Sequence, residues 1–184
     1  MRVLKNILSQ LHLYLLWLIL SAVLWGFVYG LITDAPAEKK LVIYADVYAC
    51  RDRELAEELE KTMPAGLKMI RVHPFDYAMF SDSELLNADL YLAPASRAGD
   101  YIESYSPLDG AALPWPEAEL WCFEGVAYGV RFQGAASYID YAPPGGQAEP
   151  YYLFFGVNST HTASLNGSAD DAALVVAQEL SLLP

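Results

Sequence analysis

Four polar residues stand where an α/β sheet would present them to a ligand. Asp46 and Tyr48 directly follow one predicted strand, and Ser96 and Arg97 follow another. Because ligands of open α/β sheets bind outside the carboxyl ends of the strands, we predict that these four residues line a binding site. Arg97 would pair with an anionic group, and the tyrosine would stack on a sugar ring or hydrogen-bond a polar solute. The alternative is that they are loop caps and half-buried rings.

Catalytic and metal-binding patterns are missing from the sequence. The serine-hydrolase motif Gly-x-Ser-x-Gly does not occur, and no glycine-rich loop is present to cradle a phosphate. His73 and His161 have no cysteine or second histidine at metal-ligand spacing, so we expect them in surface or capping roles. We therefore predict that the protein is not an enzyme and uses neither a cofactor nor a metal.

The elements that would position these residues follow from apolar periodicity. A continuous apolar run is typical of a strand that is covered on both faces, whereas apolar residues four apart indicate a helix. The predicted elements of the first half are a strand at 41–45, a helix at 53–63, a strand at 68–73, a short helix opened by Ser81 and Glu84, a strand at 89–93 and a helix capped by Ser96. Since such units cross over right-handedly, we expect a parallel, three-layer sheet.

Strands dominate the second half of the chain. We predict strands at 120–123, 126–132, 137–141 and 151–157, a turn region at 142–147 and a last helix at 169–182. The predicted fold class is therefore α/β, with one N-terminal transmembrane helix followed by a three-layer domain built on a mainly parallel, mixed sheet.

The beginning of the chain is typical of a membrane anchor. Residues 13–32 run for twenty positions without a charge, and a helix of that length spans a hydrocarbon layer of roughly 30 Å. Arg2 and Lys5 precede the run, which favours a cytoplasmic N-terminus. We therefore expect residues 1–37 to form a cytoplasmic stub, a transmembrane helix at about 11–33 and a short linker, with an extracytoplasmic domain at 38–184.

Cleavage of this anchor is the alternative. The Ala-Pro-Ala sequence that ends at Ala37 has the form of a signal-peptidase site. Pro36 is unfavourable there, and the apolar run is longer than that of a signal peptide. We therefore predict an uncleaved, single-pass anchor in the cell membrane.

The charge of the predicted domain restricts its partners. From Leu41 to Pro184 the sequence has 7 Lys and Arg against 21 Asp and Glu, a net charge of −14. Nucleic acids and anionic lipid surfaces are poor partners, because their phosphates would be repelled. Cys50 and Cys122 are far apart in sequence, so whether they form a disulfide stays open.

The order of elements and several short motifs resemble one lobe of the bacterial extracellular solute-binding proteins that feed ABC importers. The likeness covers about residues 40–182. The motifs that carry it are the opening strand at 41–44, Asp-Leu-Tyr-Leu-Ala-Pro at 89–94, Pro-Leu-Asp at 107–109, a Tyr-Gly pair within 125–130, and a returning strand with a histidine at 151–161.

Two departures from this family concern the second lobe. Arg131 stands where family members usually have a proline, two residues after the Tyr-Gly glycine. Between Phe132 and Tyr151, where the family would insert an entire lobe, this chain has only some eighteen residues, enough for a hairpin. Because closure around a ligand requires both lobes, this chain alone cannot clamp one.

The resemblance implies two functions. The first is a membrane-anchored extracytoplasmic accessory or interaction domain, whose partner would be a membrane protein. The second is a weak receptor for a sugar or another polar solute, in transport or sensing, that completes its cleft with a partner chain. Tyr128, at the family's hinge, joins Asp46, Tyr48, Ser96 and Arg97 as a predicted ligand contact.

Overall fold

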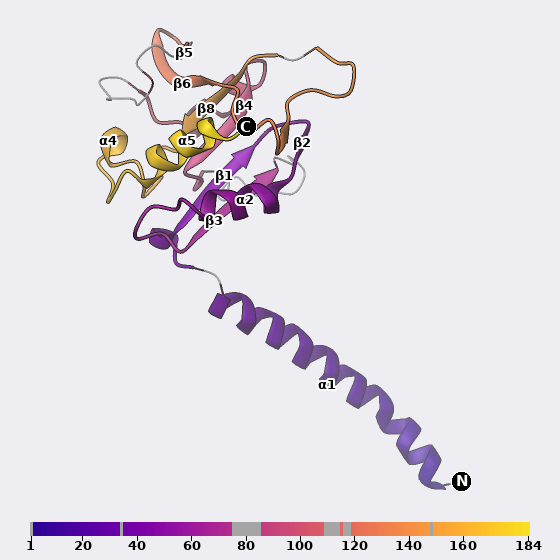
Figure 1. The fold of residues 1–184 in the computed structure, drawn as a ribbon. Helices are drawn as coiled ribbons and strands as arrows, with labels where there is room; N and C mark the ends of the chain where they lie inside the picture. Colours follow the sequence, from indigo (N-terminus) through magenta and orange to yellow (C-terminus); the bar gives the residue numbers. More distant parts are fainter. Residues whose placement is uncertain (1, 34, 75–85, 109–114, 116–118, 148) are drawn as a thin grey trace. The chain divides into compact units, whose positions relative to one another are not determined.

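The computed structural model describes residues 2–33, 35–74, 86–108, 115, 119–147 and 149–184 (Figure 1). The chain divides into two compact units, Met1–Pro36 and Ala37–Pro184. Helix α1 (Arg2–Thr33) belongs to the first unit, and the strands described below belong to the second.

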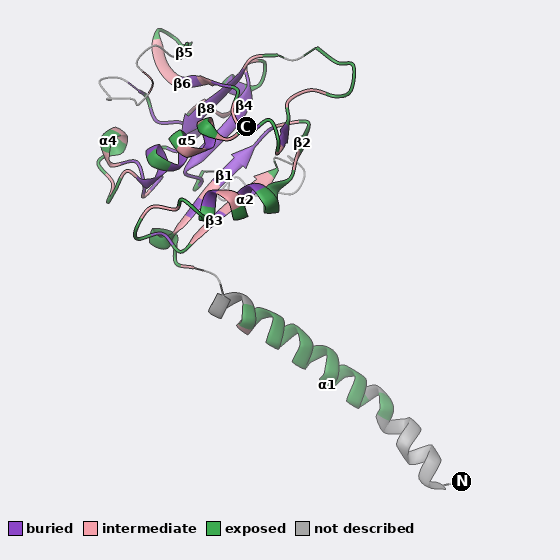
Figure 2. Cartoon of the chain, viewed as in Figure 1, coloured by how far each residue is buried: buried purple, intermediate pink, exposed green. Residues whose placement is uncertain are grey.

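Helix α1 begins earlier than the predicted 11–33 and has 32 residues. Its side chains are described at Leu11 and at 13–29, and nearly all of these are exposed, as Figure 2 shows in green. They include large apolar groups such as Trp17, Leu18 and Trp25, which are 63%, 68% and 69% exposed. Within the residues that were described, no helix combines the length and the apolar character needed to cross a membrane.

A six-stranded sheet forms the centre of the second unit, in the order β3-β1-β4-β8-β6-β5. The strands are β1 (Lys40–Ala45), β3 (Met69–Pro74), β4 (Leu90–Pro94), β5 (Leu120–Phe123), β6 (Val126–Phe132) and β8 (Tyr151–Phe155). β1 pairs in parallel with both β3 and β4, whereas β8 is antiparallel to β4 and to β6, and β5 is antiparallel to β6. The prediction of an α/β fold with a mixed sheet is thus confirmed.

Alternation along the strands separates two apolar clusters, one on each face of the sheet. On one face, residues such as Leu41, Ile43 and Leu92 pack with α2 (Asp52–Glu60) and α5 (Ala172–Leu182). The opposite face is aromatic, and its buried residues are Tyr44, Tyr91, Tyr105, Tyr152 and Phe154, together with Ala88, Ala93 and Ala98. In the described part of the chain this second face is covered by the 3-10 helix η2 (Ala98–Ser104).

Two local predictions were wrong. Ser96 does not cap the helix that follows it, because the N-cap is Arg97 and its side chain makes no capping hydrogen bond. The segment between Phe132 and Tyr151 was expected to form a hairpin, but its strand β7 (Ile139–Asp140) pairs with β2 (Ala49–Cys50), which comes directly before α2. The short helix predicted after Ser81 lies mostly outside the described residues.

Helices α2 and α5 are shorter than the apolar patterns suggested. α2 ends at Glu60 rather than at Met63, and α5 begins at Ala172 rather than at residue 169. The short helix α4 (Ala163–Asn166) ends at Gly167, whose positive φ of 76° suits glycine. The 3-10 helix η1 (Ala37–Lys39) leads directly into β1.

Candidate functional site

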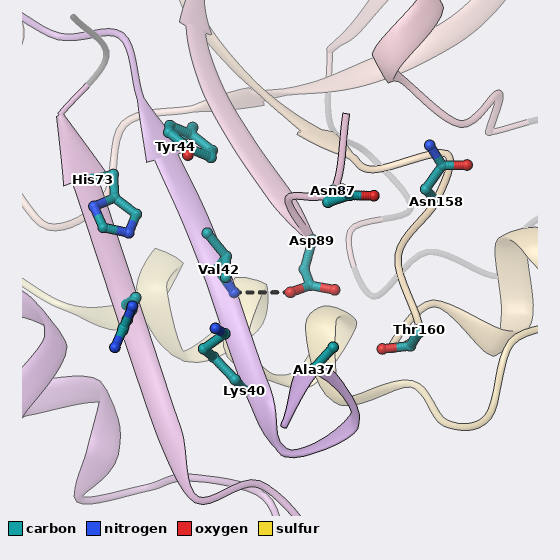
Figure 3. A pocket seen from close by; sticks show the side chains of 10 residues that line it. Ala37, Lys40, Val42, Tyr44, His73, Asn87, Asp89, Asn158 and Thr160 are labelled. Carbon is teal, nitrogen blue, oxygen red and sulfur yellow. Dashed lines mark hydrogen bonds between the residues drawn. The ribbon is translucent and has the colours of Figure 1, made fainter. Parts of the chain in front are cut away.

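A pocket of about 560 Å³ opens along β1, on the aromatic side of the sheet (Figure 3). The described residues that line it are Ala37, Lys40, Val42, Tyr44, Arg71, His73, Asn87, Asp89, Asn158 and Thr160. The pocket reaches the amino ends of β1 and β4, because Lys40 begins β1 and Asp89 comes just before β4. Asn158 joins them because β8 runs antiparallel to β4 and ends beside Leu90.

Three basic side chains of the pocket come from β1 and β3. Lys40 begins β1, and Arg71 and His73 belong to β3. The parallel pairing sets Val42 beside Arg71 and Tyr44 beside His73, so that the alternate residues of both strands face the pocket. The rings of Tyr44 and His73 lie 5.4 Å apart, tilted by 32°.

Asp89 lies in the middle of the pocket wall and is only 4% exposed. The Val42 N–H donates to its Oδ2 atom at 2.8 Å, the bond drawn in Figure 3, and the Ser159 hydroxyl donates to its Oδ1 atom at 2.6 Å. Desolvation raises the pKa of this carboxyl, while the two hydrogen bonds and nearby His161 act in the opposite direction. Asp89 therefore ties β1 and the segment after β8 to the start of β4.

A second buried group, His161, continues this hydrogen-bond network through Ser159. Its backbone N–H donates to Ser159 Oγ at 3.0 Å, and its ring is 1% exposed. Nδ1 lies 2.9 Å from Asp170 Oδ1, and Nε2 lies 3.4 Å from the Ala37 carbonyl oxygen. Both ring nitrogens of His161 thus lie beside oxygen acceptors. Of the two roles expected for His161, surface or capping, burial excludes the surface role.

The pKa of the neighbouring acid, Asp170, is shifted by its contact with His161. Desolvation raises the pKa of its carboxyl, but the hydrogen bond from the Ala172 N–H and the hydrogen bond and charge of His161 outweigh it, so that the pKa is lowered overall. The contact between His161 and Asp170 joins the loop after β8 to the start of α5. The Ala37 carbonyl connects the same network to η1, the first turn of the domain.

The site predicted at the carboxyl ends of β1 and β4 is occupied by an ion pair between two of its predicted residues. Arg97 Nη2 and Asp46 Oδ1 form an ion pair in which Asp46 is 8% exposed as a residue. Beside it remains a space of about 10 Å³, which is room for about one water. Asp46 Oδ2 is buried without a hydrogen-bond partner among the described groups. The ends of β1 and β4 do meet, but their charged residues bind each other.

The other predicted contacts lie apart from this pair. Tyr48 is 58% exposed, and the Ser96 N–H donates to Glu149 Oε2 at 3.3 Å. Tyr128 is half-buried on β6 and packs against the aromatic cluster. Of the five predicted residues, only Asp46 lines the small space at the carboxyl ends, and none lines the larger pocket.

The residues of the larger pocket were not predicted from the sequence, although the alternation along β3 indicated part of the lining. The alternation at 68–73 assigns Ile70 and Val72 to the core, and this leaves Arg71 and His73 together on the other face. Asn87, Asp89 and Asn158 had no such signal, because their meeting depends on the antiparallel insertion of β8 beside β4.

The described part of the chain contains neither a metal-binding cluster nor a disulfide. No group of three or more His, Cys, Asp or Glu side chains lies together there in a way that would hold a metal ion. Both cysteines are free, Cys50 half-buried and Cys122 exposed. Burial, with a smaller contribution from Asp52, raises the pKa of the Cys50 thiol to about 11.

No protein-family model matches this chain, and no curated protein and no solved structure shows significant similarity to it.

Proposed function

We propose that this protein is a membrane-tethered module whose α/β domain binds a small polar solute in the pocket along β1. The observation that carries this proposal is the pocket itself, with a volume of about 560 Å³ and a lining of basic, amide and hydroxyl groups. Ligand pockets usually measure about 300–1,000 Å³ and use a few convergent polar groups for specificity. This site replaces the carboxyl-end site that the sequence predicted.

The membrane tether is the second part of the proposal. Residues 13–32 lack charges, and the described side chains between Leu13 and Tyr29 are nearly all exposed. Large apolar side chains exposed on consecutive positions, such as Leu16, Trp17 and Leu18, need a lipid or protein environment. With Arg2 and Lys5 on the cytoplasmic side, the domain would lie outside the cell membrane.

Kinship with a solute-binding lobe is part of the same proposal. In support, β8 is the strand that the resemblance equates with the one returning from a second lobe, and it lies between β4 and β6. The chain thus comes back to the middle of the sheet after the point where the family would insert that lobe.

An interaction module for a membrane partner is the competing proposal. It is favoured by the Asp46–Arg97 ion pair, which occupies the edge where an ancestral cleft would open. In this version the domain contacts a membrane protein and binds no solute.

Thermal unfolding of the full chain in phosphatidylcholine nanodiscs separates the two proposals. We would screen sugars, amino acids, polyamines and small organic acids, and we expect at least one class to raise the unfolding temperature with increasing concentration, since binding to the native state stabilises it. Ala37→Trp, which adds a large side chain to the pocket lining, should abolish the shift. Ala65→Trp, at an exposed alanine outside the pocket lining, is the matched control.

The outcomes are distinct. A shift that disappears in Ala37→Trp but persists in Ala65→Trp supports a receptor that uses this pocket. A shift that both variants retain would place binding elsewhere and refute the assignment. No shift with any class would leave the interaction module as the better proposal.

A further inference from the structure

Two buried oxygen atoms near the carboxyl ends of β1 and β4 have no hydrogen-bond partner among the described residues. They are Oδ2 of Asp46 and the hydroxyl oxygen of Tyr105. Asp46 is 8% exposed and Tyr105 is 3% exposed, so neither oxygen atom reaches bulk solvent. Because most buried polar atoms in proteins are hydrogen-bonded to protein or to ordered water, each of these atoms indicates a partner that the neighbouring side chains do not supply.

Asp46 and Tyr105 line the same small space, of about 10 Å³. Asp46 comes directly after β1, whereas Tyr105 comes directly after η2. The other residues that line the space are Tyr44, Tyr91, Leu92, Ala93 and Tyr101. A space of this size holds about one water, and a buried water needs at least two polar partners. Asp46 and Tyr105 supply two such partners.

The hydrogen-bonding capacity of the two groups matches that of one water. Asp46 Oδ1 pairs with Arg97, and Oδ2 is left as an acceptor. Burial raises the pKa of the Tyr105 hydroxyl, which therefore keeps its proton at neutral pH and acts as a donor. A water accepts one hydrogen bond from Tyr105 and donates another to Asp46, so a single molecule satisfies both atoms.

A metal cation fits this space less well than a water does. The charge of the Asp46 carboxylate is already balanced by Arg97, and a second cation would add an unbalanced charge at a buried place, which is costly. Hard cations such as Ca²⁺ and Mg²⁺ also prefer about six oxygen ligands, whereas the lining of this space is mainly aromatic and aliphatic.

We propose that one ordered water binds in this space and bridges Asp46 Oδ2 to the Tyr105 hydroxyl. The water joins the end of β1 to the end of η2, the 3-10 helix that covers the aromatic face of the sheet. It also holds the carboxylate that pairs with Arg97, so that the acid, the base and the water together close the carboxyl edge. Neither Asp46 nor Tyr105 lines the pocket along β1, and the inference is therefore independent of the proposed function.

Thermal unfolding of the full chain in phosphatidylcholine nanodiscs tests the proposal through the sign of one effect. If the water is present, Tyr105→Phe removes one of its two partners and should lower the unfolding midpoint. If the Tyr105 hydroxyl is instead buried without any partner, the same variant removes an unsatisfied polar group and should raise the midpoint. Tyr48→Phe is the matched control, because Tyr48 is 58% exposed and its midpoint should equal that of the parent.

A crystal structure of the full parent chain in detergent gives a second measurement, which decides the question even if Tyr105→Phe does not fold. We expect density for one water at about 2.5–3.0 Å from both Asp46 Oδ2 and the Tyr105 hydroxyl oxygen. A direct hydrogen bond between these two oxygens, or an equal or higher midpoint for Tyr105→Phe, would refute the proposal. A parent midpoint that is higher in NaCl or KCl than in choline chloride at equal ionic strength, with the difference lost in Tyr105→Phe, would also refute it and identify a bound cation.

Discussion

Two carboxylates, the buried Asp89 and the half-exposed Asp170, connect segments that are distant in sequence. Asp89 binds the backbone of β1 through Val42 and the loop after β8 through Ser159. Asp170 binds His161 and the first turn of α5. The pKa values of the two acids are shifted in opposite directions. Burial raises the pKa of Asp89, so its ionised form costs stability, whereas the lowered pKa of Asp170 means that its ionised form stabilises the fold.

The pH dependence of Asp170→Asn follows from that sign. A lowered folded-state pKa contributes stability above the unfolded pKa of about 3.9, and the contribution disappears as the pH falls through the lowered value. We expect Asp170→Asn to lose about 0.5–1 kcal/mol at pH 7, a small amount because the side chain is half exposed, and to differ less from the parent near pH 2. Urea unfolding at both pH values measures this.

The control for this variant is Glu103→Gln, which removes one charge from an exposed position in η2. It should change stability equally little at both pH values. A loss in Asp170→Asn that is as large at pH 2 as at pH 7 would contradict the charge argument and indicate a purely steric effect.

At the scale of elements, close packing between β6 and β8 requires a glycine at position 129. Gly129 of the Tyr-Gly pair lies opposite Phe154, and a Cβ atom at this glycine would approach the Phe154 ring to 2.5 Å. That ring is fully buried and stacks on Tyr105 at a centroid distance of 4.1 Å. The glycine thus makes room for an aromatic ring in the centre of the sheet.

Gly129→Ala should therefore destabilise the domain. The Phe154 ring cannot move without disturbing Tyr105, and overpacking of a core typically costs about 1–3 kcal/mol. Gly99→Ala is the matched control, because no atom lies within 4 Å of a Cβ there. Denaturant unfolding should show a lower midpoint for Gly129→Ala alone. Equal midpoints would mean that the ring has space to shift.

At the scale of the whole molecule, the proposed tether and the proposed receptor are separate units joined at Pro36 and Ala37. Ala37 lines the pocket, and its carbonyl oxygen contacts His161. The first residue of the domain thus belongs to both the pocket and the buried network. Tethering would restrict the receptor to the membrane, where a partner chain could complete its site.

Membrane integration is the prediction at this scale. The full chain should resist extraction with alkaline carbonate, and a Leu20→Arg/Val23→Arg variant should be extracted, because each arginine in the middle of a span costs about 2.5–3.5 kcal/mol. Val175→Arg, at a position that is 43% exposed in α5, is the control for an added charge.

The orientation is tested with the same protein in intact cells. Protease added outside should digest the domain that begins at Ala37. Release of the parent chain by carbonate would contradict the tether, and a protected domain in an integrated chain would reverse the proposed topology.

Local patterns in the sequence determined the elements. Apolar runs predicted β1, β4 and β8, and alternation predicted β3, because a strand shows its burial in the order of its own residues. The strand rule selected Asp46 and Arg97 as ligand contacts, and the two residues lie at one edge, where they form an ion pair with each other. These features depend on near neighbours or on a general property of parallel strands.

Only the tertiary structure decided which partners these polar residues have and where the open pocket lies. Asp46 and Arg97 neutralise each other, and the open pocket lies along β1, where Ala37, Asp89 and Asn158 converge. That convergence requires β8 to run antiparallel beside β4, a long-range pairing that no local pattern encodes. The sequence therefore determined which segments become strands, and the order of the strands in the sheet decided which polar side chains share a cavity.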